Sequence, residues 1–308
     1  MKRVAFLFPG QGSQSVGMGK DFYENFQTAK EMFEEASDRI KVDMKKLLFE
    51  ENDKLERTEF TQPAILLVSS VAHKIFENEM SIRSVFALGH SLGEFSALVS
   101  VGALNFADAI ELVHKRGFLM QKACEGQDAG MMVLIGLADE IVEEICSDLR
   151  NEGYKVWPAN YNSDGQIVVA GIKEDLKKAE PLFKERGAKR ALLLNMSVAS
   201  HCPLLESAAK GLEPYLQEFL KDEFLSDVIS NVTAKSYNTK EEALKLLTEQ
   251  LVKPVKYKHS IKNYENDTDI FIEFGGSVLR GINRKITKKP TLSVTDSASM
   301  QSVFENIK

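Results

Sequence analysis

Residues 85–99 read Val85-Phe86-Ala87-Leu88-Gly89-His90-Ser91-Leu92-Gly93-Glu94-Phe95-Ser96-Ala97-Leu98-Val99 and join two kinds of apolar spacing across a pair of glycines. The first four residues have the pattern of a buried strand, and Phe95, Leu98 and Val99 are spaced as one face of a helix. Gly-x-Ser-x-Gly between a strand and a helix is typical of a nucleophile elbow, a sharp turn that exposes a serine hydroxyl. We therefore predict that Ser91 is a catalytic nucleophile. The alternative is a glycine-flanked turn whose serine only caps the helix.

The composition indicates a globular protein. The 308 residues are 44% hydrophobic and 27% charged, and this length favours one large domain with a smaller one. A net charge of −6 argues against general nucleic-acid binding. No apolar run approaches the roughly 18 residues of a membrane span, and residues 4–8 are too short for the apolar region of a signal peptide. Three cysteines without metal-ligand spacing predict a cytoplasmic protein with no metal site.

A glycine-rich loop, Pro9-Gly10-Gln11-Gly12-Ser13-Gln14, follows the strand predicted at residues 4–8. It invites a phosphate-binding interpretation, but Ser15 stands where the dinucleotide motif needs its third glycine. Met18 follows Gly17 where the P-loop motif needs lysine, so neither motif is met. We therefore predict no nucleotide cofactor. The loop is instead a side-chain-poor segment at the end of a strand, where open α/β sheets place their sites.

Helical patterns lie on both sides of the elbow. Residues 21–50 and 62–79 are predicted to be helical, with Thr61 as a cap and Pro63 in the first turn. Another helix is predicted from residue 105, and Arg116 falls within its apolar stripe. An inward guanidinium needs a carboxylate, because an unpaired buried charge is very costly. That carboxylate belongs to a structural ion pair or arrives with a substrate, unless the arginine side chain snorkels outward.

Residues 131–194 have a pattern of their own. The predicted order is strand, helix, strand, strand, helix, strand, with a hairpin turn at Asp164-Gly165. This is the order of a ferredoxin-like unit. We predict a ferredoxin-like small domain over 125–195, inserted into a large α/β catalytic domain made of 1–124 and 196–308. Strands at 228–232 and 270–274 and a helix over 240–251 belong to the large domain.

A serine nucleophile needs a base within hydrogen-bond reach, and the sequence has five histidines. His201 is the best placed, because it lies just after the last strand of the small domain and before a helix that begins with proline. The others lie on amphipathic helices, in a charged stretch, or beside the serine but pointing away from it: His73, His114, His259 and His90. No acidic residue stands at a strand end between Ser91 and His201, which weakens an esterase interpretation. A backbone carbonyl or an amide side chain would then orient the histidine.

The chain resembles malonyl-CoA:acyl carrier protein transacylases from residue 4 to about residue 284. Seven segments occur in the order found in that family: residues 8–14, residues 89–94, Arg116, Asn160-Tyr161-Asn162, Ser200-His201-Cys202, Gln250-Leu251 and Pro254-Val255. The resemblance implies an α/β-hydrolase-like core with a ferredoxin-like insert. Val198-Ala199-Ser200 is close to the form common in stand-alone bacterial members. Gly275-Gly276-Ser277 departs from the Gly-Pro-Gly that the family often has after its late strand.

The resemblance also implies a reaction, the transfer of a malonyl group from malonyl-CoA to the phosphopantetheine thiol of holo acyl carrier protein for fatty acid biosynthesis. Ser91, deprotonated by His201, would form a malonyl-serine ester, which gives ping-pong kinetics. The backbone N–H groups of Gln11 and Leu92 would form the oxyanion hole. Arg116 would bind the malonyl carboxylate through a bidentate pair.

Further site residues are carried over from the same resemblance. The main-chain carbonyl of Gln250 would hold the histidine, and Gln62, Asn160 and His90 would lie among the substrate-binding residues. We expect a monomer that uses no cofactor and contacts neither nucleic acid nor membrane. Two other interpretations remain open: a serine esterase or thioesterase with the same elbow, and a non-catalytic relative that binds the carrier.

Overall fold

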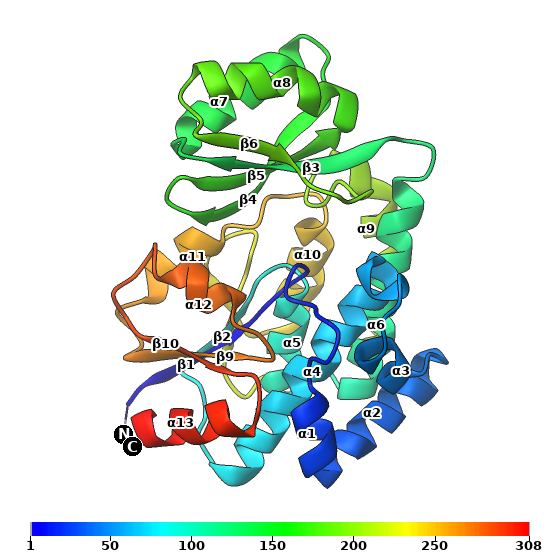
Figure 1. Ribbon diagram of the computed structural model, residues 1–308, viewed down its shortest axis with the longest axis vertical. Coiled ribbons are helices and arrows are strands. Elements are labelled where there is room, and N and C mark those ends of the chain that lie inside the picture. Colours follow the sequence, from blue (N-terminus) through cyan, green and yellow to red (C-terminus); the bar gives the residue numbers. More distant parts are fainter. Residues whose placement is uncertain (1, 308) are drawn as a thin grey trace.

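The computed structural model describes residues 2–307, so Met1 and Lys308, the outer limits of the predicted large domain, lie outside the described residues. The chain is a mixed α/β protein with two sheets, one above the other in Figure 1. Lys2 near the beginning of the described chain donates from Nζ to the carbonyl oxygen of Asn306 at 2.5 Å. The two ends of the described chain therefore lie side by side (Figure 1).

The larger sheet has six strands in the order β10-β9-β1-β2-β7-β8. They are β1 Val4–Phe8, β2 Phe86–Gly89, β7 Asp227–Ile229, β8 Ser236–Tyr237, β9 Ile270–Phe274 and β10 Thr291–Val294. All neighbouring strands are parallel except the antiparallel pair β7 and β8. Every residue of β1 and β9 is buried, as expected for strands covered on both faces. All of these residues are apolar except Glu273 in β9.

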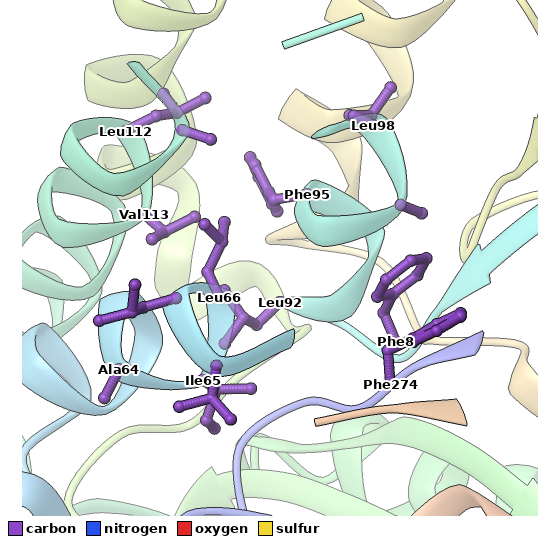
Figure 2. Packing of buried hydrophobic residues seen from close by; sticks show 14 of the residues in the cluster. Phe8, Ala64, Ile65, Leu66, Leu92, Phe95, Leu98, Leu112, Val113 and Phe274 are labelled. Carbon is purple, nitrogen blue, oxygen red and sulfur yellow. The ribbon is translucent and has the colours of Figure 1, made fainter. Parts of the chain in front are cut away.

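Helices cover both faces of this sheet. They are α1 Lys20–Asn25, α2 Gln27–Ile40, α3 Met44–Phe49, α4 Thr58–Glu79, α5 Gly93–Ser100, α6 Phe106–Ala123, α9 Glu206–Phe219, α10 Lys240–Gln250, α11 Tyr257–Tyr264, α12 Val278–Asn283 and α13 Ser297–Ile307. Side chains of β1 alternate between the two faces. Phe6 and Phe8 belong to the main core with α4, α5 and α6, part of which Figure 2 shows. Ala5 and Leu7 pack against α11 and α12 on the other face.

The smaller sheet has four antiparallel strands in the order β4-β5-β3-β6. Its elements are β3 Ala129–Ile135, α7 Asp139–Asn151, β4 Val156–Ser163, β5 Gln166–Ile172, α8 Lys173–Glu185 and β6 Arg190–Leu193. The predicted sequence of strands and helices is confirmed. Met132 and Leu134 pack beneath α7 and α8, whereas their neighbours Met131 and Val133 line a cleft on the other side. The two helices end near Gly153 and Gly187, which adopt φ values of 92° and 103° that glycine tolerates best.

The segment between α10 and α11 joins the two sheets. Val255 exchanges backbone hydrogen bonds with Ala159 and Tyr161 of β4, at 2.8 and 2.9 Å. Lys258 on α11 is buried and its Nζ lies 2.6 Å from an Asp139 carboxylate oxygen at the start of α7. The smaller sheet is therefore fixed to the larger part along β4 as well as through its two chain connections.

The prediction that Thr61 caps a helix over 62–79 is wrong. Helix α4 begins at Thr58, and Pro63 lies inside it. The Thr61 hydroxyl donates to the carbonyl oxygens of Leu55 and Arg57. The Thr58 hydroxyl accepts a hydrogen bond from Gln62 and donates to Gln11. These side-chain bonds stabilise an additional turn, although Pro63 removes one backbone donor from it.

His73 on α4 lies within an aromatic cluster. Its ring centroid is 5.2 Å from those of Phe6 and Phe274 and 6.0 Å from that of Phe8. Burial lowers the pKa of His73 to about 4. An unfolded chain takes up this proton near pH 6.5. The stabilisation from neutral His73 is therefore complete above pH 6.5 and declines as the pH falls toward 4.

We expect this histidine to make the fold sensitive to acid. Between about pH 7.5 and about pH 5, it should lower the free energy of unfolding by about 2 kcal/mol. A His73→Phe variant keeps the aromatic packing and lacks the titrating group. Over the same pH change, its free energy of unfolding should therefore fall by about 2 kcal/mol less than that of the wild type. Urea unfolding of both proteins at the two pH values measures the difference. Equal losses in the two proteins would contradict the assignment.

Candidate active site

Ser91 lies on the sharp turn between β2 and α5, as predicted. Its φ of 52° is in the left-handed region, which is strained for a residue with a side chain. A Cβ on Gly89 would lie 1.8 Å from the carbonyl carbon of Gly93, and one on Gly93 would lie 2.0 Å from the carbonyl oxygen of Phe8. Strand and helix therefore approach too closely at both positions for any side chain.

A Gly93→Ala variant is expected to be destabilised by at least about 3 kcal/mol, because the contact is with backbone that cannot rotate away. Gly281→Ala is the matched control, since a Cβ at Gly281 in α12 meets nothing within 4 Å. That change should leave stability unchanged or raise it by up to about 1 kcal/mol. Denaturant unfolding of the two variants and the wild type gives both values. Similar losses for the two would show that the elbow tolerates a methyl group.

Ser91 and His201 form a hydrogen-bonded pair, with 2.8 Å between Ser91 Oγ and His201 Nε2. On the other side of the ring, His201 Nδ1 lies 2.7 Å from the carbonyl oxygen of Gln250. A carbonyl oxygen only accepts, so Nδ1 carries the proton and the Nε2 lone pair faces the serine hydroxyl. Burial, together with the nearby Arg116 charge, lowers the pKa of His201 to about 3. The imidazole is therefore a neutral base at neutral pH, and a backbone carbonyl takes the place of the acid.

Two backbone N–H groups near the serine are free. Within residues 2–307, neither the Gln11 N–H nor the Leu92 N–H has a hydrogen-bond partner. Leu92 directly precedes α5, and Gln11 lies in the loop after β1; both line the same cleft as Ser91. Free N–H groups beside a nucleophile are the components of an oxyanion hole.

Arg116 is 1% exposed, and no carboxylate of the described chain lies within 4.0 Å of it. Its guanidinium donates to Gln62 Oε1 at 2.7 Å, to Gln250 Oε1 at 2.9 Å and to Ser91 Oγ at 3.2 Å. Burial lowers its pKa to about 10, so it remains charged at neutral pH. A structural ion pair and an outward orientation are both excluded. A buried cation beside the nucleophile has only neutral acceptors from its own chain.

The cleft between the two sheets has a volume of about 490 Å³. It is lined by eight of the nine residues predicted for the site: Gln11, Gln62, His90, Ser91, Leu92, Arg116, Asn160 and His201. The ninth, Gln250, lies behind the cleft and contacts His201 and Arg116. His90 Nε2 is 2.8 Å from Asn162 Oδ1 on β4, so the His90 side chain links the elbow to the smaller sheet and makes no hydrogen bond to Ser91 within the described residues.

Two buried polar residues beneath the elbow are absent from the set predicted from the sequence. Asn231 Oδ1 accepts the Ser91 N–H at 2.7 Å, and Asn231 Nδ2 donates to the Gly89 carbonyl oxygen at 2.7 Å. Glu94 accepts from Gln250, from the Asn231 N–H and from Tyr237, and burial raises its pKa to about 7. No signal marked Asn231, which lies within the strand predicted over 228–232. Glu94 gave none beyond its place in the elbow stretch.

Comparison with known proteins gives the family. The model of the acyl transferase domain family matches residues 5–298. The malonyl CoA-acyl carrier protein transacylase of Bacillus subtilis strain 168 is 38% identical over 313 residues, which cover 100% of this chain and 98% of that protein. The chain belongs to the malonyl CoA-acyl carrier protein transacylase family. The transacylase of Haemophilus influenzae is also 38% identical, over 99% of each chain.

Solved structures of malonyl-CoA:acyl carrier protein transacylases have the same fold as this chain. The one from Helicobacter pylori is 47% identical and superposes with a TM-score of 0.96 over 100% of this chain and 99% of that chain. A second structure shows a malonyl-transacylase in complex with a holo type II PKS acyl-carrier protein. It is 36% identical, with a TM-score of 0.95 over 99% of each chain.

Neither a metal-binding cluster nor a membrane-spanning helix occurs in the described part of the chain. Within residues 2–307, no group of three or more His, Cys, Asp or Glu side chains is placed to hold a metal ion. Over the same residues, no helix combines the length and the apolar character that crossing a bilayer requires.

Proposed function

We propose that the protein transfers a malonyl group from malonyl-CoA to the phosphopantetheine thiol of holo acyl carrier protein and so supplies extender units for fatty acid biosynthesis. One observation carries the proposal: buried Arg116 lies 3.2 Å from the Ser91 hydroxyl and has no carboxylate of its own. A malonyl group attached to Ser91 would bring the missing carboxylate to this cation. A bidentate pair of this kind is among the strong interactions of a buried site.

The reaction we infer has two similar halves. In the first, Ser91 passes its proton to His201 Nε2 and attacks the thioester carbonyl, and the N–H groups of Gln11 and Leu92 stabilise the oxyanion. The intermediate collapses to malonyl-serine, and the CoA thiolate leaves with the proton from His201. In the second half, the carrier thiol gives its proton to His201 and attacks the ester carbonyl. The intermediate collapses to malonyl-carrier, and Ser91 Oγ leaves with the proton from His201, which restores the free enzyme.

The remaining site residues support this chemistry in our proposal. The carbonyl of Gln250 keeps the His201 tautomer fixed, and Gln62 on the neighbouring helix α4 accepts a hydrogen bond from Arg116. Asn160 and His90 lie in the same cleft as the other substrate-binding residues. The reaction needs no cofactor or metal, because the thioester already carries an activated acyl group.

We further propose that the large part is an α/β-hydrolase-like domain made of 1–124 and 196–308, and that 125–195 form a ferredoxin-like domain. The strand order β4-β5-β3-β6 of the smaller sheet supports the second name. One chain holds every group that the reaction uses, which supports a monomer. Three free, buried cysteines are consistent with the reducing environment of the cytoplasm.

Release of CoA from malonyl-CoA, with and without holo acyl carrier protein, tests the proposed function. Without carrier, a transferase should release about one CoA per enzyme and then stop, because water is a poor acceptor in its site. With carrier, release should continue and malonyl-carrier should accumulate. Release of CoA over many turnovers without carrier would contradict the proposal and favour a hydrolase. No release under either condition would favour a non-catalytic relative.

A further inference from the structure

Glu94 is fully buried beneath the elbow, and three donors converge on its carboxylate. Its Oε2 accepts from Gln250 Nε2 at 2.7 Å and from the Asn231 N–H at 3.1 Å. Its Oε1 accepts from the Tyr237 hydroxyl at 3.0 Å. A buried carboxylate in the unreactive part of a site calls for an explanation, because its desolvation is costly. The reaction proposed above does not use it.

The contacts of Gln250 show what this carboxylate does. Gln250 Nε2 faces two groups that accept, the Glu94 carboxylate and the Ser91 carbonyl oxygen at 3.0 Å. The amide nitrogen must therefore stand on that side, and the amide oxygen must face the opposite way. There Gln250 Oε1 accepts from Arg116 at 2.9 Å. The orientation of one amide thus connects a buried acid to the arginine at the nucleophile.

We propose that Glu94 is a positioning residue: it fixes the amide orientation of Gln250, and the amide oxygen in turn aims Arg116 at the carboxylate of the acyl group. The inference rests on the proposed function and assigns a role in its acyl selectivity. If the amide turned over, two donors, Gln250 Nε2 and the Arg116 guanidinium, would face each other. Arg116 Nη2 would then lose the closer of its two acceptors and keep only Ser91 Oγ, so the guanidinium would shift.

The arrangement also explains why Glu94 is held away from Arg116. No carboxylate of the described chain lies within 4.0 Å of that guanidinium, and Gln250 stands between the two groups. A direct ion pair would occupy the donors that the substrate needs. A neutral amide fixes the guanidinium in place and leaves its charge for the acyl carboxylate. Glu94 therefore acts through hydrogen-bond direction and not through its charge.

Three substitutions separate direction from charge. Glu94→Gln keeps an oxygen for Gln250 and Asn231 and loses the charge, while its NH₂ group donates to the Tyr237 oxygen. Glu94→Asp keeps the charge but is one methylene shorter, so it withdraws from Gln250. Glu94→Ala removes the acceptor oxygen and the charge together. The readout is the ratio of kcat/KM for malonyl-CoA to that for acetyl-CoA, which a general loss of folded enzyme does not change.

We expect Glu94→Gln to keep this ratio within about 3-fold of the wild type. Glu94→Asp and Glu94→Ala should lower the ratio by about 10- to 100-fold, the effect of misplacing a binding group by about 1 Å. A role for charge predicts the opposite order, with Asp better than Gln, and that order would overturn the inference. Equal losses with malonyl and acetyl would overturn it as well, because they indicate only a structural role.

Two controls complete the experiment. Tyr237→Phe removes another donor from the same carboxylate without touching Gln250, and we expect the ratio to stay within about 3-fold, the range of a peripheral hydrogen bond. Glu273→Gln removes a different buried carboxylate, which accepts from the N–H groups of Leu279 and Arg280, and should not change the ratio. The wild type tests the proposed function separately: if it forms no malonyl-enzyme, that function fails whatever the variants do.

Discussion

A Ser91→Ala variant is expected to form no acyl-enzyme from malonyl-CoA and to lose about 10⁶-fold in kcat, the usual cost of removing a nucleophile from an intact catalytic pair. The reason is geometric. Ser91 Oγ is the only hydroxyl within hydrogen-bond distance of His201 Nε2 in the described chain, so no other group can accept the acyl chain with the same base. The fold should survive, because the elbow is held by Gly89, Gly93 and Asn231 and not by the serine side chain.

Intact-mass measurement after mixing with malonyl-CoA checks this expectation. Wild-type protein should gain the mass of one malonyl group, and Ser91→Ala should gain none. Ser100→Ala is a suitable control, since its hydroxyl lies at the other end of α5 and bonds to Ala97 O. It should be acylated like the wild type. A stoichiometric adduct on Ser91→Ala would assign the nucleophile to another residue.

Replacing Arg116 has the second large effect. Arg116→Ala should lower kcat/KM for malonyl-CoA by about 10³-fold, because the charged acyl carboxylate would enter a buried site without a partner. Acetyl-CoA carries no carboxylate, so its rate should fall much less and the preference between the two donors should collapse. Arg116→Lys should remain poor with malonyl, since an ammonium group cannot reproduce the planar pair of donors. Equal losses with both donors would show that Arg116 is structural.

The free energy of unfolding gives an independent test of the role of Arg116. An Arg116→Met variant removes a buried charge that has only neutral acceptors and fills much of its volume. It should therefore unfold at the same or a higher denaturant concentration than the wild type, although it loses malonyl transfer. A clear loss of stability would mean that the guanidinium is satisfied by the protein without substrate.

The parts of the site that local spacing governs could be predicted from the sequence. The elbow depends on residues 85–99 alone, and Arg116 is marked by an apolar stripe that it interrupts. His201 is marked by its place between a predicted strand and a helix that begins with proline. The roles of Asn231 and Glu94 could not be predicted, because they depend on contacts between segments about 140 residues apart. Neither residue breaks a local pattern, so no rule of periodicity selects it.

Two element boundaries differ from the prediction because of side-chain hydrogen bonds. Helix α4 begins before Pro63 because the hydroxyls of Thr58 and Thr61 find partners in other segments. The strand predicted over 228–232 ends at Ile229. The Ser230 hydroxyl oxygen accepts hydrogen bonds from the N–H groups of Val232 and Thr233, which turns the chain at this point. That turn carries Asn231 beneath the serine. Side-chain hydrogen bonds thus decide both boundaries, and the spacing of apolar residues does not reveal them.

The neighbouring ends of the chain have a consequence for how this protein can be joined to others. Lys2 and Asn306 are in contact, and β1 leads from there to the loop of Gln11, so the catalytic cleft lies at the opposite end of that strand. Polypeptide added at either end would leave on the same side and away from the cleft. A short linker should connect the two ends into a circular chain, which could be reopened at a surface loop such as Asp164-Gly165. The same geometry would suit one domain of a longer polypeptide. Domains fused to either end would both be attached on the side opposite the catalytic cleft.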